Sequence, residues 1–125
     1  MKILYDYQIM CQQRYGGISR YFFELAQRLS KNYNCDVDCR SVLSQNYYFE
    51  SYYKKKAFYP YPPKTTKIIL TLNKLLLLLS NVNRYDIIHQ TYYDPYILGK
   101  YNGKLVITVY DMIHELFPEE FIYDK

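Results

Sequence analysis

Three short segments carry the side chains that could do chemistry, and each lies in a loop that follows an expected strand. The first is Arg14-Tyr15-Gly16-Gly17, which opens an expected helix. Adjacent glycines let a backbone approach a ligand closely, and the free N–H groups of a first helical turn favour an anion. The pair Gly16 and Gly17 therefore indicates an anion site, with a plain tight turn as the alternative. The Gly-x-Gly-x-x-Gly spacing of dinucleotide sites is absent.

The other two segments bring histidines and carboxylates to strand ends. One begins His89-Gln90-Thr91, and the other reads Tyr110-Asp111-Met112-Ile113-His114-Glu115. A histidine at a strand end can bond a substrate hydroxyl, and it can equally be a satisfied core residue. Asp111 and His114 are three residues apart, so a helical turn would place them on one face. There they could orient each other or bind a polyol.

Hydrophobic periodicity predicts the elements that position these segments. Apolar runs predict strands over residues 2–6, 36–43, 85–90 and 104–110. An amphipathic stripe predicts a helix from Ile18 to Leu29, and a second helix is expected from Thr65 or Thr66 to about Asn81. This alternation predicts one α/β domain over residues 1–125, a Rossmann-like parallel sheet with flanking helices. Ligands of such sheets bind at the carboxyl ends of the strands.

Four stretches refine this picture. Residues 104–110 are apolar on both faces apart from Thr108, which is typical of a strand in the middle of a parallel sheet. Residues 92–101 are short for the crossover that a parallel neighbour requires. Residues 7–17 are expected to form a polar loop. Residues 44–64 fit either an edge strand or a loop that covers the sheet.

The composition limits the classes of function. The three cysteines, Cys11, Cys35 and Cys39, have no disulfide-framework or zinc-site spacing, so buried free thiols are expected. The net charge of +4 is modest. The basic run of residues 54–56 is expected to be a solvated loop, with weak attraction to anionic lipid head groups as an alternative and a nucleic-acid groove as a weaker one. We expect no nucleic-acid partner. We interpret the abundance of tyrosine, with 18 residues, as compositional drift, and an aromatic binding surface is the weaker alternative.

Two observations concern location. Met1-Lys2 runs directly into a strand-like segment, so no signal peptide is expected. Residues 68–79 are too short for a membrane span and predict a buried or interfacial helix. We expect a cytoplasmic protein, with a peripheral contact to a membrane surface as an additional option.

Taken together, the three segments resemble one family. They read Tyr15-Gly16-Gly17-Ile18-Ser19-Arg20-Tyr21-Phe22, Tyr85-Asp86-Ile87-Ile88-His89-Gln90-Thr91-Tyr92-Tyr93 and Val109-Tyr110-Asp111-Met112-Ile113-His114-Glu115-Leu116-Phe117-Pro118-Glu119. In this order they resemble the amino-terminal domain of family 4 glycosyltransferases, and the resemblance covers nearly the whole chain.

The resemblance implies a GT-B fold, in which two Rossmann-like lobes face each other across a cleft. It implies retaining transfer of a sugar from a UDP- or GDP-sugar to a glycan, lipid or other acceptor, with no bound metal or cofactor. Gly16 and Gly17 would approach the donor diphosphate. The implied catalytic residues are His89, Asp111 and His114. The implied acceptor-side or sugar-side residues are Arg20, Tyr92, Asp94 and Glu115.

Two departures from the family pattern qualify what the resemblance implies. Many relatives have His-Asp where this chain has Tyr110-Asp111, so His114 could take over the work of that histidine. The Glu-x7-Glu pair of the family's second lobe has no counterpart in this sequence. We therefore expect an incomplete amino-terminal lobe that is inactive without a separate carboxyl-terminal lobe. The alternative is a non-catalytic module that binds sugar or phosphate, or another protein.

Overall fold

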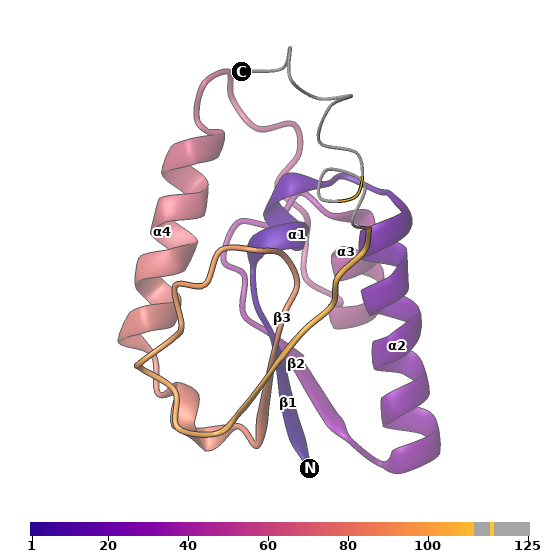
Figure 1. Cartoon of the computed structure of the whole chain (residues 1–125). Helices are drawn as coiled ribbons and strands as arrows, with labels where there is room; N and C mark the ends of the chain where they lie inside the picture. The colour runs from indigo at the N-terminus through magenta and orange to yellow at the C-terminus, as the bar shows by residue number, and fades with distance from the viewer. Residues whose placement is uncertain (112–115, 117–125) are drawn as a thin grey trace.

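A four-stranded, all-parallel sheet forms the centre of the protein, with helices on both of its faces (Figure 1). The computed structural model describes residues 1–111 and Leu116. The strands are β1 (Lys2–Tyr5), β2 (Asp36–Cys39), β3 (Ile87–Gln90) and β4 (Lys104–Ile107), and their order across the sheet is β2-β1-β3-β4. The predicted α/β, Rossmann-like fold class is therefore confirmed.

Helices from both halves of the chain cover the sheet. They are α1 (Gln8–Gln12), α2 (Gly17–Tyr33), α3 (Tyr47–Tyr53) and α4 (Thr66–Leu79), followed by the 3-10 helix η1 (Val82–Arg84). Figure 1 shows α2 and α3 on one side of the strands and α4 on the other. Both long helices thus lie where the apolar periodicity predicts them, because each needs to bury its apolar residues against the sheet.

The two faces of the sheet build two separate cores. On the α2 and α3 face, Tyr5 and Val37 pack with Phe22, Ala26 and Phe49. On the α4 face, buried side chains from β1, α4, η1 and β3 pack together: Leu4, Ile69, Leu77, Val82 and Ile88. Alternate residues of β1 serve opposite cores because successive side chains of a strand point to opposite faces.

The structure adds two helices to the expected elements. Residues 8–12 form α1 inside the predicted polar loop, because Ile9, Met10 and Cys11 are buried. Within residues 44–64, residues 47–53 form α3 rather than an edge strand. The Asn46 side chain caps α3 by accepting a hydrogen bond from the Phe49 N–H at 3.0 Å.

β4 lies at an edge of the sheet, so the expectation of a central position is wrong. In the part of the chain that the structure describes, β4 pairs with β3 alone. The exposed fractions of its apolar side chains are 36% at Leu105, 39% at Val106 and 48% at Ile107. An apolar run predicts a strand equally well at an edge or in the middle, and only the neighbours decide its position. Residues 91–103 connect the two parallel strands without an α-helix.

The cysteines and the helix lengths agree with the sequence analysis. Cys11, Cys35 and Cys39 are buried and free, as predicted. Burial raises the pKa of Cys39 well above its usual range, which keeps that thiol protonated at neutral pH. No helix within the described residues has the length and apolar character needed to cross a membrane.

Candidate functional site

The carboxyl ends of β1, β3 and β4 meet at one edge of the sheet, and two of the three predicted segments join there directly. His89 at the end of β3 shares a hydrogen bond of 2.8 Å with Thr108, which follows β4. The Tyr110 hydroxyl donates to the Thr91 carbonyl at 2.9 Å. The Tyr110 N–H donates to the Tyr93 hydroxyl at 3.0 Å. These contacts fix the loop after β4 against the loop after β3.

His89 lies in an aromatic pocket between β1 and α2. The rings of Tyr5 and Phe22 pack edge-on against its imidazole, with centroids 5.6 and 5.0 Å away. Only 7% of His89 is exposed. Burial lowers the pKa of His89 to about 4, so the imidazole is neutral at pH 7 and can donate one hydrogen bond and accept another.

The first segment reaches this edge through α2, since Phe22 also packs edge-on against Tyr110 at 6.4 Å. Gly16 precedes α2 in an extended conformation, and a Cβ there would lie 2.8 Å from the flexible end of Gln13. Gly17 begins the helix, and a Cβ there would contact nothing within 4 Å. The N–H groups of such a first turn lack partners within the helix. Gly17 therefore presents open backbone at the helix start.

A shallow surface groove of about 380 Å³ adjoins Gly17. Arg20 and Arg28 line it together with Glu24, which pairs with Arg20 at 3.8 Å. The side chains of this ion pair are largely exposed, so it contributes little to stability. The guanidinium of Arg20 thus stays available beside the helix start.

A buried carboxylate, Asp6, organises the loop after β3. Asp6 follows β1 and is fully buried. Its Oδ1 accepts hydrogen bonds from the Thr91 hydroxyl at 2.5 Å and the Thr91 N–H at 3.0 Å. Its Oδ2 accepts from Gln8 Nε2 at 2.7 Å and from the Tyr96 hydroxyl at 3.1 Å. Burial raises the pKa of Asp6, and the hydrogen bonds from Thr91 and Gln8 oppose that rise.

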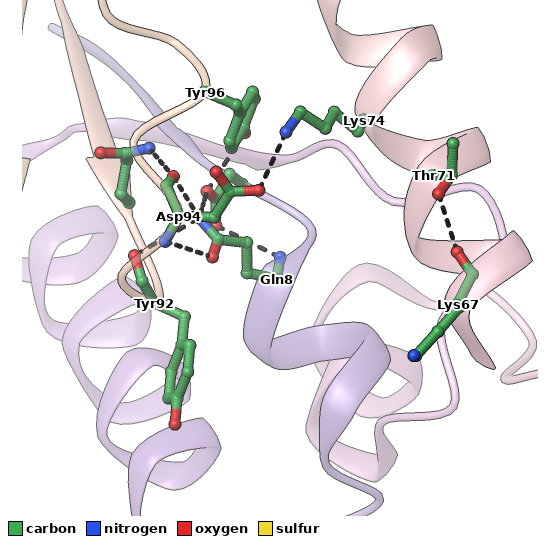
Figure 2. Close-up of polar contacts among 9 residues, drawn as sticks. Gln8, Lys67, Thr71, Lys74, Tyr92, Asp94 and Tyr96 are labelled. Atoms are coloured by element: carbon green, nitrogen blue, oxygen red, sulfur yellow. Dashed lines mark hydrogen bonds and ion pairs between the residues drawn. The ribbon is translucent and has the colours of Figure 1, made fainter. Parts of the chain in front are cut away.

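Gln8 extends this network to the backbone of the loop, as Figure 2 shows. Its Oε1 accepts from the Asp94 N–H at 3.1 Å, and its Nε2 donates to the Asp94 carbonyl at 3.2 Å. Gln90 donates to the same carbonyl at 2.8 Å. From α4, Lys74 forms an ion pair with the Asp94 carboxylate at 3.1 Å (Figure 2). The loop therefore holds Asp94 in one place with its carboxylate at the surface.

The structure brings some of the predicted site residues together and leaves others apart. His89 and Tyr92 belong to the joined loops, with His89 buried and Tyr92 half-buried. Arg20 is exposed on α2. Asp111 is exposed at the end of the described range. His114 and Glu115 lie outside the described residues.

Sequence reasoning missed the side chains that hold the site in shape. Asp6, Gln8, Tyr96 and Thr108 have no motif around them. The available signal is an aspartate at the carboxyl end of a strand, where parallel α/β sheets place their polar residues. A carboxylate at such a position is either a ligand or, as Asp6 is here, an internal anchor.

Within the described residues, no group of three or more His, Cys, Asp or Glu side chains gathers closely enough to hold a metal ion. Comparison of the chain with protein-family models, with curated proteins and with solved structures finds no match. The functional interpretation therefore depends on the site and on the motifs.

Proposed function

We propose that this chain is the amino-terminal, acceptor-side part of a retaining family 4 glycosyltransferase, which transfers a sugar from a UDP- or GDP-sugar to a sugar-containing acceptor. One observation carries the proposal. The loops after β3 and β4 are joined by hydrogen bonds at the carboxyl edge of a parallel sheet, and α2 packs against both through Phe22. This is the edge at which α/β folds bind ligands.

In this proposal the helix start binds the donor diphosphate. The open backbone at Gly17 admits phosphate oxygens to the first-turn N–H groups. Arg20, which the resemblance assigns to the acceptor or sugar side, lines the groove beside the helix start and adds positive charge there. Neutral His89 hydrogen-bonds near the transferred sugar, with Thr108 fixing the orientation of its ring. Tyr92 and Asp94 face the acceptor, and Asp111 with His114 and Glu115 complete the site. The proposed mechanism involves no metal or cofactor.

Transfer requires a second lobe that stabilises the leaving nucleotide diphosphate. In the family this lobe carries a Glu-x7-Glu pair, which the present sequence does not contain. The test therefore joins residues 1–125 to a carboxyl-terminal lobe of the family and measures steady-state transfer from UDP- and GDP-sugars. The variant Gly17→Val adds a branched side chain where phosphate oxygens approach. We expect its kcat/KM for the donor to fall at least about tenfold.

The control is Gln27→Val, which places the same side chain on an exposed position of α2. Both variants should fold, since the space beside Gly17 is open, and circular dichroism checks this. If Gly17→Val folds and transfers sugar at the parent rate, the glycines form only a turn and the proposed diphosphate site is wrong.

A non-catalytic module that binds sugar or phosphate is the second candidate. The buried state of His89 favours it, because the Nε2 of that ring already bonds Thr108. Measurements on the same chimera distinguish the two candidate functions. Donor binding that depends on Gly17 without any transfer supports the binding module. Transfer that falls strongly in His89→Gln, and less in Thr108→Val because the imidazole is kept but less well oriented, supports catalysis by the imidazole.

A further inference from the structure

The outer face of α4 is apolar along its whole length. Ile69, Asn73 and Leu77 point inward and are buried. The opposite face exposes five large apolar side chains: Ile68, Leu72, Leu75, Leu76 and Leu79. Their exposed fractions reach 67% at Ile68 and 83% at Leu79. The spacing places them on one stripe of the helix, which we call the α4 stripe.

The basic residues of the chain are concentrated in the sequence segment that contains this stripe. Residues 51–85 contain six lysines and one arginine and no acidic residue. The remainder of the chain contains nine basic and twelve acidic residues. The positive net charge of the protein therefore comes entirely from the segment that contains α4.

Basic side chains lie on both sides of the α4 stripe. Lys64 precedes α4, and Lys67 is exposed in its first turn (Figure 2 labels Lys67 and Lys74). On the other side, Lys55 and Arg40 line the same cavity of about 330 Å³ as Leu76 of the stripe. This cavity also contains Asp38, which pairs with Arg40 at 3.6 Å.

Exposed aromatic rings accompany the lysines. Phe58 and Tyr59 lie between Lys56 and the start of α4, and both are exposed. Tyrosine is enriched where a membrane meets water, since its ring is apolar and its hydroxyl is wet, and the apolar ring of Phe58 can enter the bilayer beside it.

We propose that the α4 stripe and the lysines around it bind the surface of an anionic lipid bilayer. The leucines enter the boundary between head groups and acyl chains, and the lysines attract the anionic head groups. The helix then lies in the plane of the membrane surface. A second copy of the chain is a poor occupant, because a symmetric contact would bring the two sets of lysines together. This proposal is independent of the glycosyltransferase assignment.

The test measures co-sedimentation of the full chain with phosphatidylcholine vesicles, with and without phosphatidylserine. We expect binding to the anionic vesicles to be at least about tenfold tighter and to weaken with salt. Leu75→Ser with Leu79→Ser should abolish binding to both vesicles. Replacing Lys55, Lys64 and Lys67 with Gln should remove the preference for phosphatidylserine.

Two matched controls should retain binding. Tyr33→Ser removes an exposed apolar residue at the far end of α2, and replacing Lys31, Lys100 and Lys104 with Gln makes the same charge change elsewhere. Circular dichroism confirms folding. Equal binding to both vesicles, no binding, or equal losses from the two lysine variants would overturn the proposal. It is also wrong if the leucine variant abolishes self-association in sedimentation but leaves lipid binding intact.

Discussion

Asp6 is fully buried, yet both of its carboxylate oxygens accept hydrogen bonds. Asp6→Asn replaces one of these acceptors with an NH2 group that faces other donors. We expect the free energy of unfolding to fall by about 2–3 kcal/mol, measured by urea denaturation. Asp94→Asn is the matched control, because that carboxylate is exposed and its ion pair with Lys74 should contribute less than about 1 kcal/mol. Equal effects of the two variants would show that Asp6 is not an anchor.

His89 makes the fold sensitive to acid. Its pKa is lowered to about 4 in the folded chain from an ordinary value near 6.5, so the unfolded chain binds more protons between these values. Stability from His89 is therefore complete above pH 6.5 and is lost as the pH falls toward 4. Asp6 has the opposite effect, because its pKa is raised in the folded chain. Its contribution to stability is complete below the pKa of the unfolded chain and decreases as the pH rises through the pKa of the folded chain.

A comparison of the wild type with His89→Gln separates the pH dependence due to His89 from that due to Asp6. Between pH 7.5 and pH 5, the His89 contribution to the free energy of unfolding should decrease by about 2 kcal/mol. The wild type should therefore lose about 2 kcal/mol more than His89→Gln over this range, as measured by urea denaturation at both pH values. Identical pH dependence in the two proteins would contradict the buried, neutral state of His89.

At the scale of single residues, the sequence indicates where chemistry is concentrated but not which side chains are accessible. His89 can be chosen because it stands near the end of an apolar strand, whereas Asp94 is implied only by the family resemblance. Whether His89 is open or packed depends on Tyr5 of β1, Phe22 of α2 and Thr108 in the loop after β4. The role of Asp6 is equally hidden, since its partner Thr91 is 85 positions away.

At the scale of elements, periodicity predicts α2, α4 and the four strands, because each has an apolar pattern long enough to recognise. The short helices α1 and α3 have only one or two turns. Their formation depends on tertiary contacts such as the hydrogen bond from Asn46 Nδ2 to the Gln13 carbonyl at 2.8 Å. A single apolar run also cannot state which strand lies beside it, which is why the position of β4 was predicted wrongly.

Because β4 is an exposed edge strand, we expect copies of the chain to associate with each other. Its apolar residues and its unpaired edge in the described structure invite pairing with a second copy. We expect concentration-dependent association in sedimentation velocity experiments. Ile107→Lys, which places a charge on this edge strand, should shift the population toward the monomer. Lys31→Ile, far from β4, should leave the monomer fraction no higher, and a strictly monomeric wild type would contradict the prediction.

At the scale of the whole molecule, the proposal assigns the site residues to one side of a cleft and a second lobe to its other side. The 125-residue polypeptide should therefore show no sugar transfer from UDP- or GDP-sugars, because leaving-group stabilisation is missing. A radiolabelled donor assay with glycan and lipid acceptors measures this. Adding a separately expressed carboxyl-terminal lobe of the family should produce transfer. Turnover by the polypeptide alone, abolished by Gly17→Val, would contradict this expectation.

The central position of β1 has a consequence for synthesis on the ribosome. β1 is synthesised before its neighbour β3 and before the Thr91 partner of Asp6, which follow some 85 residues later. At about 5–20 residues per second, β1 and Asp6 wait roughly 4–17 seconds for them. During that interval one edge of β1 lacks its native partner, and water hydrates the Asp6 carboxylate in place of Thr91. The edge of β1 that later pairs with β3 is thus open to other partners until residues 87–91 have been made.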